Sequence, residues 1–254
     1  LVSAKGNACL EVGNVDGVRV SGILLQAGPE NADSLLTWGD DSKYAGDQAN
    51  PGVMQDVFAR VGGPDTEEVM ATNMLTVNSG NVIIDDTWLW RADHGQGGPV
   101  MDSQNPCDTG LLINGDNVTG YGLAVEHTLG NMLEWNGENG ESYFFQSEYP
   151  YDVTQENYGD KGYAAYKVGD DVQNHKSWGA GVYSFFRDHA VIVESGIQTP
   201  QDREIEFTNA LTVFLNGMGQ INHVINNVGD LVKTGQQLSY QCSWTDQPDR
   251  FLTE

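Results

Sequence analysis

The chain has 254 residues, of which 39% are hydrophobic, and its 12 basic and 36 acidic residues give a formal charge of −24. Nucleic acid and anionic lipid surfaces both need a basic protein surface, so this charge argues against either as a partner. It also disfavours a polyuronate substrate, whereas a neutral polysaccharide carries no such penalty. A simpler interpretation is that the acidity only keeps a secreted or salt-adapted protein soluble.

The distribution of turn residues indicates an all-β protein. The 31 glycines, with frequent asparagine and aspartate, are typical of many tight turns. Helical periodicity is weak, and only residues 206–218 and 230–238 pass as possible helices. Residues 1–10 lack the basic and apolar regions of a signal peptide, and no apolar run reaches the roughly 18 residues of a membrane span. We interpret the chain as a mature or truncated piece of something longer.

Three segments share a pattern of apolar strand, Gly/Asn/Asp turn and second strand: residues 8–28, 73–95 and 110–130. In the second strand of each segment the pattern falls at relative positions zero, two, five and seven, counted from the first residue of each set. These residues are Val18, Val20, Ile23 and Leu25 in the first segment, Val82, Ile84, Thr87 and Leu89 in the second, and Val118, Gly120, Leu123 and Val125 in the third. Repetition at fixed offsets indicates stacked coils that bury one another's apolar faces. With irregular insertions such as residues 31–50 and 136–141, it predicts a right-handed, pectate-lyase-like parallel β-helix, in one domain over residues 1–254. A β-sandwich is the alternative, but it predicts evenly spaced hairpins.

The same alignment places several outward-facing side chains in one column. Alternate residues of a strand face opposite sides, so Glu126 faces away from Leu123 and Val125. Glu148 likewise faces away from a side expected to hold Tyr143, Phe145 and Ser147. The resulting column contains Gln26, Trp90, Glu126 and Glu148, with Trp88 on the same face. Exposed indoles on a flat sheet often form binding platforms. An equal alternative is that loops cover Trp88 and Trp90, which would then form a secondary core.

Glu126 and Glu148 form a candidate acid/base pair. Two close carboxylates do not both ionise at their ordinary pKa, so one becomes a proton donor. We expect the aromatic residues Phe144, Phe145, Tyr149 and Tyr151 to surround Glu148 and raise its pKa further. A glutamate pair on a sheet is also, more commonly, just a solvated surface. Asp93 and His94 follow the Trp90 strand into a loop that suits sugar hydroxyls, although a turn that satisfies its own backbone is commoner.

Metal and cofactor chemistry find little support. The pairs Asp40–Asp41, Asp85–Asp86 and Asp170–Asp171 resemble calcium ligands in type, but turn formation explains them better. Cys9, Cys107 and Cys242 are widely spaced and form no zinc pattern. They leave open one disulfide with a free thiol, or three buried thiols. We therefore predict no metal and no cofactor.

Three runs resemble glycoside hydrolase family 55, the exo-acting β-1,3-glucanases or laminarinases with two β-helix domains: DTWLWRADHG (86–95), GLLINGDNVTGYGLAVEHTLGNMLEWNGENG (110–140) and YFFQSEYPYDVTQ (143–155). The resemblance implies a secreted, inverting exo-hydrolase that releases glucose from the non-reducing end of laminarin-type glucan. By position, Glu148 matches the general acid and Glu126 matches a carboxylate that holds the nucleophilic water. The substrate-binding residues expected around them are Trp90, Asp93, His94, His127, Gln146 and Tyr151.

The chain departs from that family in length. The family's catalytic unit is about twice as long, so the chain resembles its second half and is expected to need the N-terminal β-helix domain as its partner. Adjacent strands would also hold the carboxyl groups near the roughly 5 Å of retaining enzymes, rather than the 6.5–9.5 Å of inverting ones. Either the side chains splay apart, or Glu126 is one of several groups that hold the water, and we favour the second.

Two other functions stay open at this point. A non-catalytic carbohydrate-binding or adhesion β-helix would use the Trp88 and Trp90 face as its platform. A polysaccharide lyase would need a basic residue near the column, usually with a cation. The sequence places only Arg91 there, which disfavours a lyase.

Overall fold

The structure, a computed structural model, describes residues 1–40, 44–64 and 67–245. Asp41, from one of the aspartate pairs, lies outside the described residues. The first strands are β1 (Leu10–Val12), β2 (Arg19–Gln26), β3 (Ala32–Trp38), β4 (Gly52–Val61), β5 (Ala71–Val77), β6 (Val82–Arg91), β7 (His94–Gly95) and β8 (Gly98–Pro99). They are followed by β9 (Cys107–Ile113), β10 (Thr119–Glu126), β11 (Leu133–Trp135), β12 (Gly140–Glu148), the short 3-10 helix η1 (Gly159–Lys161), β13 (Tyr166–Val168), β14 (Asn174–Gln198), β15 (Glu204–Ile225) and β16 (Leu238–Thr245).

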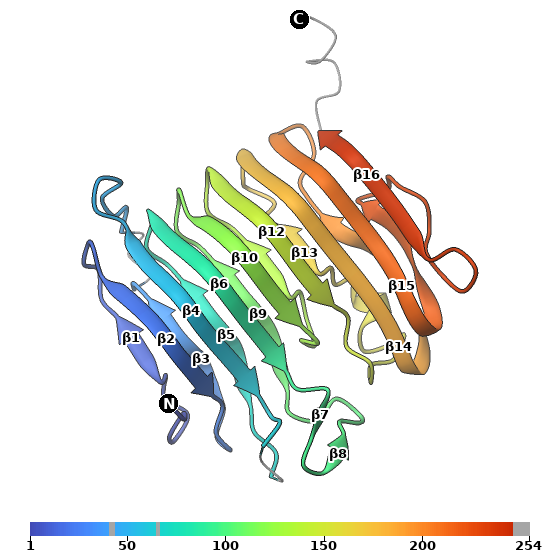
Figure 1. The fold of residues 1–254 in the computed structure, drawn as a ribbon, viewed down its shortest axis with the longest axis horizontal. Coiled ribbons are helices and arrows are strands. Elements are labelled where there is room, and N and C mark those ends of the chain that lie inside the picture. The colour runs from blue at the N-terminus through green and yellow to red at the C-terminus, as the bar shows by residue number, and fades with distance from the viewer. Residues whose placement is uncertain (41–43, 65–66, 246–254) are drawn as a thin grey trace, which may run out of the picture.

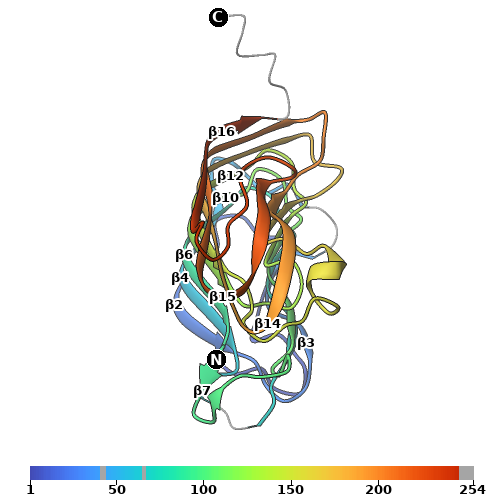
Figure 2. The same ribbon diagram turned by 90° about the vertical axis from the view of Figure 1, so that its right-hand side faces the viewer.

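The strands stack as successive coils of a parallel β-helix, which confirms the predicted fold. One layer pairs β2, β4, β6, β10, β12 and β14 in that order, all parallel (Figure 1). The other pairs β1, β3, β5, β9, β11 and β13, also parallel, and the two layers face each other (Figure 2). The long strands β14 and β15 run through both layers, and β16 pairs antiparallel with β15. That a second β-helix domain lies outside this chain stays a prediction.

A row of left-handed residues crosses the first layer and explains the repeated offsets. The strands β2, β4, β6, β10, β12, β14 and β15 each have one residue with φ between 51° and 73° at the same level: Gly22, Asp56, Asp86, Gly122, Phe144, Gly179 and Asn209. We call this set the bulge row. The register skips each of them, so inward positions are three residues apart there instead of two. The offsets of zero, two, five and seven are therefore the sequence signature of a bulge stacked in every coil.

The core lies between the two layers. Leu123, Val125 and Phe145 are buried there, as parity predicts, among large side chains such as Trp38 and Trp135. The turns are held by an asparagine ladder, in which Nδ2 of Asn114 donates to Asn78 and Nδ2 of Asn136 donates to Asn114, at 2.8 and 3.0 Å. No helix of the described residues is long and apolar enough to cross a membrane.

Several expectations about local structure were wrong. Residues 206–218 belong to β15, and residues 230–238 form bridges and turns rather than a helix. Tyr143 faces outward, because the bulge at Phe144 reverses the strand's alternation. All three cysteines are free thiols, so neither a disulfide nor three buried thiols is found: only Cys107 is fully buried, while Cys242 is exposed.

Candidate active site

The predicted column of outward side chains exists, with two additional members. In register across six strands stand Gln26, Arg60, Trp90, Glu126, Glu148 and Tyr183. Glu126 and Glu148 are direct neighbours on β10 and β12, which are strands about 4.8 Å apart. The carboxylates therefore lie side by side on the outer face, near the ends of their strands.

Two indoles lie beside Glu126. Trp88 and Trp90 stack with ring centroids 5.1 Å apart, and Trp88 stays 43% exposed, so loops do not cover it. Nε1 of Trp88 donates a 2.8 Å hydrogen bond to Oε2 of Glu126. Because β6 and β12 flank β10 on opposite sides, this bond draws the Glu126 carboxylate away from Glu148. This contact supports the first of the two explanations given above, in which the two glutamate side chains splay apart to reach the carboxyl separation of an inverting enzyme. The role of Glu126 in holding water stays a prediction.

Glu148 lies in a setting that favours its protonated form. Its side chain is only 16% exposed, and burial raises the pKa of its carboxyl group. The negative charges of Glu126 and Asp93 raise that pKa further, whereas a hydrogen bond from Tyr151 lowers it. Burial dominates, so the pKa of Glu148 lies above its ordinary value. Of the four aromatic residues expected around it, Tyr151 contacts it, while Phe145 and Tyr149 point into the core and Phe144 stands at the bulge.

Asp93, His94 and His127 complete the site from its loops. Oδ1 of Asp93 accepts from Nε1 of Trp90 at 3.2 Å, and Oδ2 lies 3.0 Å from Nδ1 of His94. The His127 side chain is 3% exposed, and its Nδ1 lies 3.1 Å from the Tyr149 carbonyl oxygen. Its Nε2 faces Asp93 Oδ1 at 3.8 Å and Glu148 Oε2 at 4.0 Å.

His127 is kept neutral by its surroundings. Burial lowers the pKa of its imidazole, against the opposing effect of nearby Asp93 and Glu126. A protonated imidazole beside Glu148 would favour the ionised form of that carboxyl group, and a neutral imidazole does not. The buried imidazole thus faces Asp93 and Glu148, and its role in binding substrate stays a prediction. By contrast His94, at 66% exposure, is open to solvent at the edge of Trp90.

A buried ion pair holds the site's loops together. Arg91 is fully buried directly after Trp90, and its Nη1 and Nη2 bind the two Asp152 oxygens at 3.0 and 2.9 Å. The same guanidinium donates to the carbonyl oxygens of Gln104, Asn105 and His127. Arg91 thereby joins the end of β6 to the loops that carry His127 and Asp152.

Some expectations about the site need correction. Arg91 is not the basic residue of the column, because it points into the protein. Arg60 occupies the column instead, with its Nε donating to Oε1 of Gln26. The run PGVMQDVFARV carries the repeat at Gly52, Met54, Val57 and Ala59, which places Arg60 outward and could have revealed it. Arg187, whose guanidinium lies 5.8 Å over the Tyr151 ring, comes from a distant strand that no local pattern indicates.

The remaining predicted residues fall at the margins of the pair. Gln146 is outward on β12, level with Trp88 and two residues before Glu148. Gln26 lies three strands from Glu126 in the column and bonds Arg60 and the Gly62 carbonyl oxygen. Within the described ranges, no three His, Cys, Asp or Glu side chains are arranged to hold a metal ion.

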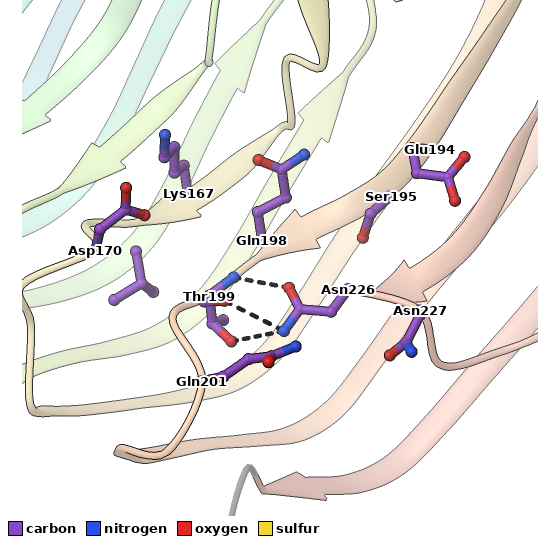
Figure 3. Close-up of a pocket in the computed structure, with 10 residues that line it drawn as sticks. Lys167, Asp170, Glu194, Ser195, Gln198, Thr199, Gln201, Asn226 and Asn227 are labelled. Atoms are coloured by element: carbon purple, nitrogen blue, oxygen red, sulfur yellow. Dashed lines mark hydrogen bonds between the residues drawn. The ribbon is translucent and has the colours of Figure 1, made fainter.

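A separate hollow of about 410 Å³ lies on other elements. It is lined by residues of β13, the end of β14 and the turn after β15 (Figure 3). There Asn226 Oδ1 accepts from the Thr199 backbone, and its Nδ2 donates to Thr199 oxygens at 3.1 and 3.2 Å. These side chains are committed to closing a turn, so the outer-face carboxylates are the better candidate for chemistry.

The fold and this site together define a pectate-lyase-like parallel β-helix with paired carboxylates beside aromatic rings. Residues 1–148 match the LAM55 pectate lyase-like domain, and the chain belongs to that family. The match includes both Glu126 and Glu148. It confirms the resemblance to glycoside hydrolase family 55.

Known relatives are similar to this chain in sequence and in structure. An exo-beta-1,3-glucanase of Streptomyces sp. strain SirexAA-E is 44% identical over 235 residues, which are 91% of this chain and 38% of the relative. The solved structure of sacteLam55A from Streptomyces sp. SirexAA-E superposes with a TM-score of 0.90 at 42% identity, covering 96% of this chain and 45% of that one. A variant of it in complex with glucose gives 0.90 at 41% identity, covering 96% and 44%. The chain thus spans less than half the length of these relatives.

Proposed function

We propose that the chain is the acid-bearing part of an exo-β-1,3-glucanase, which hydrolyses laminarin-type glucan from the non-reducing end with inversion. The observation that carries this is the state of Glu148, a largely buried carboxyl group of raised pKa beside a second carboxylate. Glycoside hydrolysis needs a protonated carboxyl group to donate to the leaving oxygen. The relative named exo-beta-1,3-glucanase supports β-1,3-glucan as the substrate.

In this mechanism Glu148 protonates the glycosidic oxygen as the bond to the anomeric carbon breaks. Water attacks that carbon from the opposite face and loses its proton toward Glu126. The Trp88 indole holds the Glu126 carboxylate on the far side from Glu148, which leaves space for that water. His127 and Tyr151 position Glu148, while Trp90, Asp93, His94 and Gln146 surround the bound sugar.

We further propose a partner and a location for this activity. The outer face presents one side of a site, so the N-terminal β-helix domain of the same enzyme would supply the other side and further groups that hold water. The partial coverage of the relatives supports such a domain. A polymeric glucan lies outside cells, and we therefore propose a secreted enzyme. No cofactor is required by this chemistry.

The test is glucose release from laminarin by this chain joined to that domain. Glu148→Gln keeps the shape of the side chain but cannot donate a proton, so it should reduce the rate at least a hundredfold. Glu141→Gln is the matched control, because Glu141 is an outward residue of the same strand, far from the pair. Undiminished turnover by Glu148→Gln would sink the assignment, as would an equal loss in the control.

A non-catalytic carbohydrate-binding role is the second candidate, favoured by the 43% exposure of Trp88. A binding module would keep its glucan affinity in Glu148→Gln and lose it in Trp90→Ala. A lyase would instead form an unsaturated product that absorbs in the ultraviolet. Arg60 is the basic residue such a reaction would need, but its bond to Gln26 occupies it two strands away from Glu126.

A further inference from the structure

Phe144 is unusual in both its backbone and its exposure. The other six members of the bulge row are glycine, aspartate or asparagine, the residues that tolerate a left-handed backbone. Phe144 holds φ at 65°, which is a strained conformation for an aromatic residue. Its side chain is nevertheless 65% exposed, so packing in the core does not repay the strain. Strain without burial indicates a function for the ring.

The surroundings of Phe144 leave its ring open. Its neighbours in the bulge row are Gly122 on one side and Gly179 on the other, neither of which has a side chain to cover it. A Cβ built at Gly179 would meet nothing nearer than the Phe144 Cα at 3.9 Å. A Cβ at Gly122 would meet only the Asp86 backbone, at 3.8 Å or more. The ring therefore projects from a bare strip of the sheet.

Adjacent aromatic rings differ in this respect. Tyr121, Tyr143 and Trp178 stand in register one position before the bulge and stack face to face, with centroids 5.1 and 4.6 Å apart and planes within 15°. Stacking covers both faces of Tyr143 and one face each of Tyr121 and Trp178. In the described part of the chain no ring contact involves Phe144, so its faces stay accessible.

Phe144 is continuous with the candidate active site. It lies on β12 with Gln146 and Glu148, on the same outer face, about 13 Å before Glu148 at roughly 3.3 Å per residue. Across one glycine in the bulge row stands the exposed carboxylate of Asp86. Such a negatively charged surface repels anionic ligands but can accept hydrogen bonds from the hydroxyl groups of a neutral sugar.

We propose that Phe144 is a distal glucan-binding platform, which stacks against a sugar of the same β-1,3-glucan chain several units from the bond cleaved at Glu148. The proposal rests on the proposed function for the identity of the polymer. The apolar C–H face of a pyranose ring matches an open aromatic face, and its hydroxyl groups remain for Gln146 and Asp86. A disaccharide held at Glu148 is too short to reach Phe144, whereas a hexasaccharide is long enough.

The variant Phe144→Asn separates function from structure, because asparagine tolerates the left-handed backbone. Asp56→Asn, in the same bulge row but three strands away from Phe144, is the matched control. Relief of strain should raise the melting temperature of Phe144→Asn by about 2–4 °C. In a native gel containing laminarin, retardation of the 254-residue chain should fall for Phe144→Asn and persist for the control. In the assembled enzyme, kcat/KM should fall about three- to tenfold for laminarihexaose and stay unchanged for laminaribiose.

Each contrary result overturns the proposal. Equal retardation of wild type and Phe144→Asn, or no retardation of wild type, would show that Phe144 binds no glucan. A lower melting temperature with equal losses on both substrates would mean that the ring packs against the other domain. If the assembled enzyme cleaves no glucan, the proposed function fails, and the gel still tests Phe144 separately.

Discussion

Replacing Arg91 by methionine should destabilise the protein by about 3–5 kcal/mol. The change keeps an apolar stem in the same space but removes the partner of a buried carboxylate, and such a change typically costs this much. Three backbone carbonyl groups would also lose donors. Urea unfolding of the two proteins measures the difference directly, provided the m-values agree.

The double variant Arg91→Met/Asp152→Asn identifies the cause. If the loss comes from the uncompensated charge, removing that charge should recover at least 1 kcal/mol of it. Burial alone would raise the pKa of Asp152, but its bonds to Arg91 and the attraction of that charge lower the pKa below its ordinary 3.8. The stabilisation is therefore present above pH 4 and disappears as pH falls through the lowered value. A single-variant loss below 1 kcal/mol, or no recovery in the double variant, would refute the reasoning.

Three further predictions concern the site and the core. Tyr151→Phe removes a bond that lowers the pKa of Glu148, so the high-pH limb of the rate profile should move to higher pH; a shift downward would contradict this. Burial lowers the pKa of His175 to about 3, so protein stability should fall as pH drops below 6.5, and in His175→Phe urea unfolding should show a shallower fall. Gly137→Ala should prevent folding, because its Cβ would collide with the Gly115 backbone of the preceding coil, whereas Gly13→Ala should leave the circular dichroism melt unchanged.

Much of the fold could be predicted because a β-helix repeats its pattern in every coil. Inward positions such as Val125 and Leu89 keep the same offsets, so aligning them places Trp90 and Glu126 in one column without any knowledge of the turns. The irregular step of three within those offsets was visible too. Without its physical cause, the left-handed bulge, the outward direction of Tyr143 could not be derived.

The remainder of the site depends on contacts that have no local signal. Arg91 continues the alternation as an inward residue, but its partner Asp152 lies 61 residues away. The approach of Asp93 to His127 likewise depends on how two loops leave neighbouring coils. Alternation fixes which face a side chain is on, whereas loop conformation decides which atoms meet there.

The wider implication concerns how a flat sheet would make the proton donor that we propose. Glu148 needs no enclosed cavity of its own, because the neighbouring strand supplies a second carboxylate and a loop supplies a buried neutral imidazole. The regular strand spacing of about 4.8 Å would by itself set the two carboxylates close together, and the hydrogen bond from Trp88 directs the Glu126 carboxylate toward β6, on the side opposite Glu148. A repeating scaffold thus becomes an asymmetric site through a few side chains.

The most direct measurement is the pKa of Glu148 itself, followed through its ¹³C carboxyl resonance in the folded chain and in Glu126→Gln. Burial and two neighbouring carboxylates should place it above the ordinary 4.5 in the unaltered chain. Removing the charge of Glu126 should then lower it. A pKa at or below 4.5 in the unaltered chain would contradict the assignment of Glu148 as the proton donor.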